Sequence, residues 1–269
     1  KDIREIYSTG RGSIKLRARY KYDKKNSCIE IYEIPYTTTV EAIIDKVIEL
    51  VKQGKIRDIT DIRDETDLSG LKIALDIKKN TDPDKLMYKL FKMTPLQDSF
   101  SCNFNILING VPRVLGVKEI LHEWTLFRIN CIKRQLVFDI DKKSDKLHLL
   151  KGLKKILLDI DKAIKIIRGT EQDSEVVPNL MKGFDIDELQ AEFIAEIKLR
   201  NLNKEYILKR TEEIDSLEKE IEDLQATLKD ESRIKKIIIK ELKEVVKKYG
   251  QPRRTEIIYE ENMEEIKNL

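Results

Sequence analysis

Four basic side chains alternate with apolar ones near the start of the chain, in the stretch SIKLRARYKY (residues 13–22). Successive side chains of a β-strand point to opposite faces, so a period of two gives this stretch one charged face and one apolar face. Basic side chains about 7 Å apart along a strand would contact the phosphates of a nucleic-acid backbone, which repeat along each DNA strand at about half that spacing. Such contacts hold a duplex without reading its sequence. The candidate residues are Arg11, Lys15, Arg17, Arg19 and Lys21.

The same pattern is also typical of a solvated strand face whose charges keep the surface soluble, and the pattern alone leaves both interpretations open. Tyr20 and Tyr22 fall on the apolar face, so we expect them to pack in a core rather than stack on bases. Arg253 and Arg254, near the other end of the chain, are secondary candidates for the same surface.

The composition favours long solvated helices over a compact enzyme. Of 269 residues, 41% are hydrophobic, which is enough for a core, and 38% are charged, well above the usual quarter. The 52 basic and 49 acidic residues nearly cancel, so a surface that binds polyanions must arise from local sorting of charge. The first 25 residues show such sorting, because they hold nine Lys or Arg against three Asp or Glu.

Other patterns that could do chemistry are incomplete. The sequence GRG lacks the spacing of a phosphate-binding loop, and no H-E-x-x-H pattern surrounds His122 or His148. Asp139, Asp141 and Asp145 fail as a calcium loop, since the fifth and sixth positions of the loop are a lysine and a serine. The sequence therefore predicts no metal, nucleotide or catalytic site.

Three features indicate the cellular setting. The three cysteines, Cys28, Cys102 and Cys131, are widely spaced, which favours a reducing cytoplasm over a disulfide framework. No apolar run reaches the length of a membrane span, and no signal-peptide pattern precedes the charged start.

Because the chain lacks an initiator Met, we expect it to be a piece of a longer protein.

The pattern of residues 1–115 predicts an α/β domain, here called the base. Two alternating runs around a polar turn, within residues 20–34, predict a hairpin. Apolar residues at helical spacing predict a helix from Val40 to Val51, with a capping box from Thr38 to Glu41 and a stop at Gly54. Further strands are expected at 71–77 and 102–108, with a short helix between them that Asp82 and Pro83 open.

The remainder predicts a long antiparallel coiled coil with a small all-α tip. One heptad seam of apolar residues runs through residues 116–145 and a second through 203–249. Each seam is buried by the other if the two helices pair. Residues 146–202 would form the tip, and 250–269 would return to the base, where Thr255–Tyr259 could add a strand. The expected seams are Ile120, Trp124, Phe127, Cys131 and Phe138, paired with Ile207, Ile214, Leu217, Ile221, Leu224 and Leu228.

The expected tip is too small to have much core of its own, which predicts that it gains stability from a second copy of the chain. Its surface for a homodimer would be an apolar helical face wider than the tip itself needs. The alternative is that this face only closes the core of the tip against Ile156, Ile160 and Ile164. The expected interface residues are Ile186, Leu189, Phe193, Ile194 and Ile197.

Four long blocks, residues 7–19, 33–73, 94–121 and 249–257, resemble the A subunit of the bacterial type IIA DNA topoisomerases, DNA gyrase and topoisomerase IV. The resemblance extends from end to end of the chain and does not separate the two enzymes. It implies a tower domain that flanks the bent gate segment of double-stranded DNA. It also implies a coiled-coil arm that ends in a helical, dimeric exit gate through which the transported duplex leaves.

The resemblance further implies that this part of the protein is not catalytic. The family cuts DNA with a tyrosine in an Arg-Tyr-Thr context upstream of the YSTGRG block, whereas Arg19-Tyr20 follows that block and continues as Lys21. Mg²⁺ and ATP would belong to the partner B subunit of a cytoplasmic, ATP-hydrolysing bacterial isomerase that associates with the nucleoid. Catalytic residues, metal ligands and cofactors are therefore expected to be absent from this piece.

Two other classes of protein remain as alternatives. A structural coiled-coil protein that organises chromosomes would also use an antiparallel arm, but it would carry ATPase motifs, and none occurs here. A non-enzymatic DNA-binding module would lack an ATPase partner. A pull-down that recovers an ATPase B subunit with the full-length protein would exclude this alternative.

Overall fold

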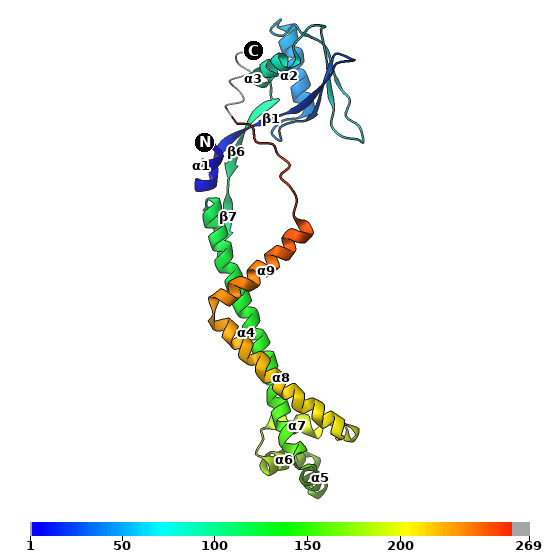
Figure 1. The fold of residues 1–269 in the computed structure, drawn as a ribbon, viewed down its shortest axis with the longest axis vertical. Helices are drawn as coiled ribbons and strands as arrows, with labels where there is room; N and C mark the ends of the chain where they lie inside the picture. Colours follow the sequence, from blue (N-terminus) through cyan, green and yellow to red (C-terminus); the bar gives the residue numbers. More distant parts are fainter. Residues whose placement is uncertain (1, 260–269) are drawn as a thin grey trace. The chain divides into compact units, whose positions relative to one another are not determined.

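The computed structural model describes residues 2–259 and contains both helices and β-sheets (Figure 1). Contacts divide the chain into two compact units. One contains the chain up to Glu123 and again from Pro252, and the other comprises Trp124–Gln251. The expected combination of α/β structure and a mainly helical part is confirmed at this level. None of the helices in the described range is long and apolar enough to cross a membrane.

The core of the first unit lies against a four-stranded antiparallel sheet with strand order β2-β3-β5-β4. Apolar side chains of the two inner strands join those of two helices in one buried cluster, which includes Ile31, Leu75, Val47 and Leu90. The elements are β2 (Arg19–Asp23), β3 (Cys28–Glu33), α2 (Val40–Lys52), β4 (Ile59–Asp64), β5 (Ile73–Ile77) and α3 (Pro83–Met93).

Side-chain caps fix where the two helices of this unit begin. The α2 cap is Thr39, whose hydroxyl accepts from the backbone N–H of Ala42, so the expected cap at Thr38 is wrong by one residue. Gly54, with φ of +70°, follows the end of α2 as expected, because a residue without Cβ adopts this conformation without strain. Asp82 caps α3 by accepting from the backbone of Asp84 and Lys85, as its position before Pro83 predicts.

The single basic strand expected over residues 13–22 is wrong, because the structure divides it between two sheets. Strand β1 (Arg11–Arg17) pairs with β6 (Gln97–Asn103), whereas β2 pairs with β3. Ala18 separates them, with 6% of its surface exposed and its N–H donating to the carbonyl of Leu96 at 2.8 Å. The small side chain fits into the core at this point, and the chain changes its pairing partner there.

Two glycines permit a close backbone crossing where β1 begins. A Cβ on Gly10 would lie 2.3 Å from the carbonyl oxygen of Leu115, and one on Gly116 would lie 2.3 Å from that of Ser8. Gly10 also has φ of +75°, which other residues rarely adopt. The crossing holds α1 (Asp2–Thr9) and β1 beside the segment that follows β7 (Asn105–Ile108) and β8 (Val111–Val114).

Helix α4 (Val117–Leu157), which belongs to the second unit from Trp124 onward, lies antiparallel to α8 (Lys204–Lys229) and α9 (Glu231–Tyr249). Ion pairs give this direction, since Arg128 pairs with Glu241 and Lys143 pairs with Glu220. Asp230 separates α8 from α9 and caps the latter by accepting from the N–H of Ser232. The core between α4 and α9 consists of Ile129, Ile132, Leu136, Ile234 and Ile238.

The seam predicted on α4 is wrong, so the predicted pairing of the two seams with each other is wrong as well. Trp124, Phe127 and Phe138 are 41%, 63% and 64% exposed, because Ile129, Ile132 and Leu136 form a second stripe on nearly the opposite side of the helix. On α8 the predicted Ile214, Leu217 and Ile221 are buried, and Leu224 and Leu228 are packed.

Short helices close the far end of the second unit around a separate core. Leu153 of α4, Leu180 of α6 and Ala191 of α7 are fully buried there. Lys155 and Lys162 donate to the carbonyls of Asp185 and Gly183 and so satisfy the end of α6. The elements are α5 (Ile160–Gly169), the 3₁₀ turn Asp173–Glu175, α6 (Val176–Phe184), α7 (Glu188–Ala195) and the 3₁₀ turn Leu199–Asn201.

The strand expected at Thr255–Tyr259 is wrong, since residues 251–259 form neither helix nor strand. Ile257 and Ile258 are 37% and 52% exposed, so no sheet face buries them. Within the first unit, side chains of this segment contact the start of the chain: Arg253 lies 3.5 Å from the Tyr7 hydroxyl, and Glu256 lies 3.5 Å from Arg19. The rest of the expected return segment, 260–269, lies outside the described residues.

Candidate nucleic-acid interface

The exposed face of the β1–β6 ladder carries polar side chains and no carboxylate. In the antiparallel register Arg11 lies opposite Asn103, Ser13 opposite Ser101, Lys15 opposite Ser99 and Arg17 opposite Gln97. All of these except Arg17 and Gln97 are exposed, whereas the residues between them are partly buried. Figure 1 shows the two strands side by side. The only acidic residue of the two strands, Asp98, belongs to the other face, where it accepts from Thr37 at 2.6 Å.

Arg11 and Lys15 are the candidate residues that remain available for phosphates. Both are exposed on this face, about 14 Å apart at the usual rise of a strand. Within residues 2–259 neither has a carboxylate within ion-pair distance. Their charges are therefore not neutralised by the chain in the described range.

Arg17 lies at the end of the same row but packs against the protein. Its Nε donates to Gln97 Oε1 at 2.7 Å, and its guanidinium lies 4.8 Å from the centre of the Phe91 ring. Burial lowers the pKa of Arg17, although the group stays charged at neutral pH. These contacts fix the end of the ladder.

Arg19 and Lys21 belong to β2 and are already paired with acids. Arg19 lies 3.8 Å from Glu33 and 3.5 Å from Glu256, and Lys21 lies 2.7 Å from Glu30. The five candidates thus do not form one row, because the break at Ala18 places two of them on another sheet.

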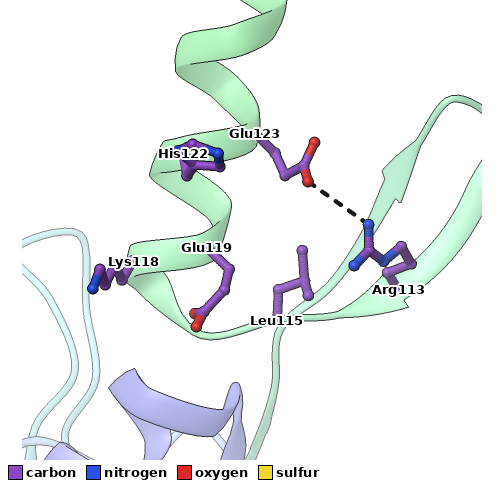
Figure 2. A pocket seen from close by; sticks show the side chains of 6 residues that line it. All are labelled: Arg113, Leu115, Lys118, Glu119, His122 and Glu123. Carbon is purple, nitrogen blue, oxygen red and sulfur yellow. Dashed lines mark ion pairs between the residues drawn. The ribbon is translucent and has the colours of Figure 1, made fainter.

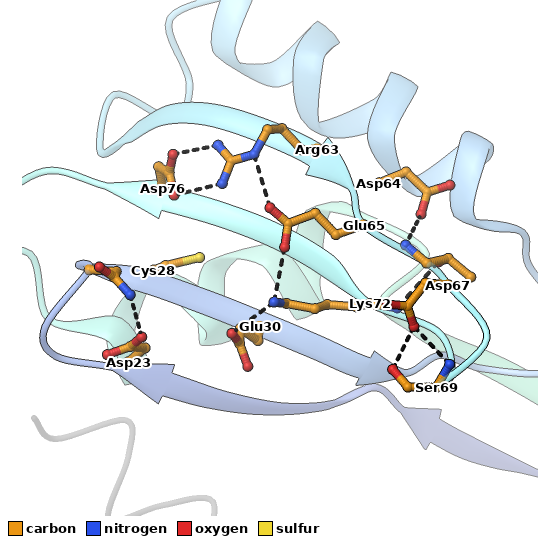
Figure 3. A network of polar contacts seen from close by, with 12 residues as sticks. Asp23, Cys28, Glu30, Arg63, Asp64, Glu65, Asp67, Ser69, Lys72 and Asp76 are labelled. Atoms are coloured by element: carbon orange, nitrogen blue, oxygen red, sulfur yellow. Dashed lines mark hydrogen bonds and ion pairs between the residues drawn. The ribbon is translucent and has the colours of Figure 1, made fainter.

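The outer face of the four-stranded sheet carries an ion-pair network (Figure 3). Arg63 binds Asp76 through Nη1 at 2.5 Å, and the hydrogen bonds that Arg63 donates to Asp76, Asp61 and Glu65 raise its pKa. Lys72 joins Glu65 at 2.9 Å and Glu30 at 3.1 Å, so each cation there has an acidic neighbour. The acidic partners distinguish this network from the carboxylate-free β1–β6 face.

Tyr20 is partly buried against the core of the first unit and is hydrogen-bonded there. Its hydroxyl donates to Asp84 Oδ1 at 2.7 Å, and its ring packs 6.2 Å from that of Phe91. Burial, followed by the contact with Asp84, raises the pKa of the phenol well above its usual range. The protonated hydroxyl is a poor nucleophile, and the ring lies with the core as its place in the sequence predicts.

A shallow pocket of about 260 Å³ lies where β8 meets the first turns of α4 (Figure 2). Arg113 pairs with Glu123 across it at 3.7 Å, and Lys118, Glu119 and His122 also line it. Within the described residues no three His, Cys, Asp or Glu side chains are grouped as a metal site. His148, the other histidine, contacts Asp187 in the second unit.

The five residues predicted for a dimer interface have different environments. Ile186 and Ile194 are each only 7% exposed in the core at the end of the second unit, and Phe193 and Ile197 pack partly against that core. Leu189 alone of the five is largely exposed, at 65%. Further exposed leucines of this region are Leu158 and Leu199, which the sequence pattern did not single out.

Comparison with known proteins identifies the family of the chain. The family model that describes the A subunit of DNA gyrase and topoisomerase IV matches residues 1–243. The DNA gyrase A subunit of Clostridium acetobutylicum is 38% identical over 99% of this chain, and that of Ureaplasma parvum is 36% identical over 96%. A probable DNA gyrase A subunit of rice, described as chloroplastic/mitochondrial, is 34% identical over 94%. The chain covers 32%, 31% and 28% of the lengths of these three relatives. This chain therefore belongs to the family of DNA gyrase and topoisomerase IV A subunits.

Proposed function

We propose that the chain is the DNA-holding and dimerising part of the breakage-reunion subunit of an ATP-dependent type II DNA topoisomerase. Family membership over almost the whole chain supports the enzyme class. The observation that carries the DNA-binding role is the exposed β1–β6 face, where Arg11 and Lys15 have no acidic partner in the described range. This face would contact the phosphates of a gate segment that the tower flanks.

The paired helices would form the coiled-coil arm, with residues 116–145 on one side and 203–249 on the other. The opposite order of the Arg128–Glu241 and Lys143–Glu220 pairs supports an antiparallel arm. Residues 146–202 would form the all-α exit gate, where two copies of the chain meet. The largely exposed Leu189 supports a contact at this tip, since an exposed leucine gains free energy when a partner covers it.

The chain would contribute no catalytic residue. In this proposal the nucleophilic tyrosine lies upstream, and Mg²⁺ and ATP bind to the partner B subunit of a cytoplasmic, nucleoid-associated holoenzyme. The engaged, protonated hydroxyl of Tyr20 is consistent with this assignment. A non-enzymatic DNA-binding protein or a chromosome-organising coiled coil is not favoured, because the relatives reported above are gyrase subunits.

Fluorescence anisotropy with a labelled DNA duplex of about 30 base pairs tests the DNA-binding role. Binding should be indifferent to sequence and fall steeply with salt, because released counterions supply much of the free energy. Reversing the charges of Arg11 and Lys15 together should abolish most of the binding at low salt. Unchanged affinity in a folded double variant would show that the face is only a solvated surface.

A further inference from the structure

The β6 strand adds neutral hydrogen-bonding groups to the basic face of β1. In the antiparallel register Ser99 lies directly opposite Lys15, Ser101 opposite Ser13 and Asn103 opposite Arg11. Side chains directly opposite each other share one face of the ladder, with Cβ atoms about 5 Å apart. All three β6 residues are exposed, and within residues 2–259 no hydrogen bond engages their side chains, since Ser99 donates to Asp98 only through its backbone N–H.

We infer that Ser99, Ser101 and Asn103 of β6 bind DNA phosphate oxygens together with Arg11 and Lys15. The inference rests on the proposed DNA-binding function and extends it to a second strand with no charged donor. Hydroxyl and amide groups commonly donate to phosphate, so a basic side chain and a neutral donor in one row could hold the same phosphate group. No acidic side chain of β1 or β6 lies on this face, so the two strands themselves present no negative charge to the ligand.

The chemistry of the face favours a phosphate backbone over unstacked bases. The alternate residues Ile14, Leu16 and Phe100 lie on the other face of the ladder, so no aromatic ring is offered for stacking. Successive rows along an antiparallel strand are about 7 Å apart, which presents donors at regular intervals along the strand. An extended row of donors is suited to the edge of a duplex, which presents its phosphates in series.

Neutral and charged contacts have different salt signatures, and this difference makes the inference testable. A lysine or arginine that neutralises a phosphate contributes about 0.9 to the slope of log K against log salt. A hydroxyl or amide releases no counterion, so its loss should weaken binding about two- to tenfold and leave that slope unchanged.

The experiment measures anisotropy of the labelled duplex with the full chain between about 50 and 200 mM salt. The variants are Ser99→Ala, Ser101→Ala and Asn103→Ala, alone and combined, with Lys15→Ala as the charged comparison. Ser232→Ala, an exposed serine at the start of α9, is the matched control. Thermal melting checks that each variant is folded.

We expect the β6 variants to lower affinity in parallel at every salt concentration, and Lys15→Ala to lower both the affinity and the slope. If Lys15→Ala acts as expected while the combined β6 variant binds like wild type, the inference is overturned and the proposed function stands. If the wild-type chain itself does not bind the duplex, the proposed function fails and the inference fails with it.

Discussion

Truncation of Leu189 to alanine should weaken self-association of the chain without unfolding it. Leu189 is 65% exposed in the single chain, whereas its neighbours Ile186 and Ile194 are buried in the local core. A two-fold interface uses each residue twice, so any loss at this position counts twice per dimer. The variant therefore separates contact between copies from packing within one copy.

The size of the effect follows from the exposed area. Complete burial of a leucine side chain is worth about 1.5–3 kcal/mol, so covering the 65% that is exposed is worth about 1–2 kcal/mol per copy. Two copies give about 2–4 kcal/mol, which corresponds to a rise in the dimer dissociation constant of about 30- to 900-fold.

Sedimentation equilibrium over a range of protein concentrations measures this constant. Leu68→Ala is the matched control, because Leu68 is fully exposed in the turn between β4 and β5. Ile194→Ala should instead lower the stability of the fold and change the dissociation constant little. A folded Leu189→Ala variant with the wild-type dissociation constant, or a wild-type chain that is monomeric at micromolar concentration, would refute the interface at the tip.

Three further outcomes are expected. Gly10→Ala should lower the free energy of unfolding by about 1–3 kcal/mol, because the alanine Cβ would lie 2.3 Å from the Leu115 carbonyl oxygen and the φ of this residue is +75°. Urea titration measures this change, and an unchanged urea midpoint would contradict the close crossing. Burial, followed by the contact with Asp76, raises the pKa of the Cys28 thiol to about 11. Iodoacetamide at neutral pH should therefore alkylate Cys28 only after the protein unfolds, which mass spectrometry would show. Rapid labelling of Cys28 in the native protein would contradict this environment. The double variant Glu33→Gln/Glu256→Gln should raise DNA affinity up to about fivefold by removing both acidic partners of Arg19, and an unchanged affinity would argue that Arg19 does not face the ligand.

The sequence predicted those elements that depend on residues close to one another along the chain. The helix over 40–52, the Asp82 cap of α3 and the α8 seam all follow from spacing and capping within a few residues. The break at Ala18 could not be predicted this way, because it depends on pairing with β6, about 80 residues further along the chain. The pairing partner of a strand is a tertiary property that alternation alone does not contain.

The α4 seam and the β6 donors show two further limits of sequence reasoning. Helix α4 carries two apolar stripes at similar spacing, and only the packing of α9 against Ile129 and Ile132 reveals which one is covered. Ser99 and Ser101 have no charge to attract attention in a sequence. They became candidates only when the register placed them beside Lys15 and Ser13.

Site-specific photo-crosslinking tests most directly whether duplex DNA lies on the exposed face of the β1–β6 ladder. A photoreactive phenylalanine analogue is placed at Ser13, between Arg11 and Lys15, and in a second sample at the fully exposed Leu68. After irradiation with the labelled duplex at low salt, a covalent protein–DNA adduct should form from position 13 and be lost at high salt, with none from position 68. Adducts of equal yield from both positions, or from position 68 alone, would contradict the assignment of this face to DNA.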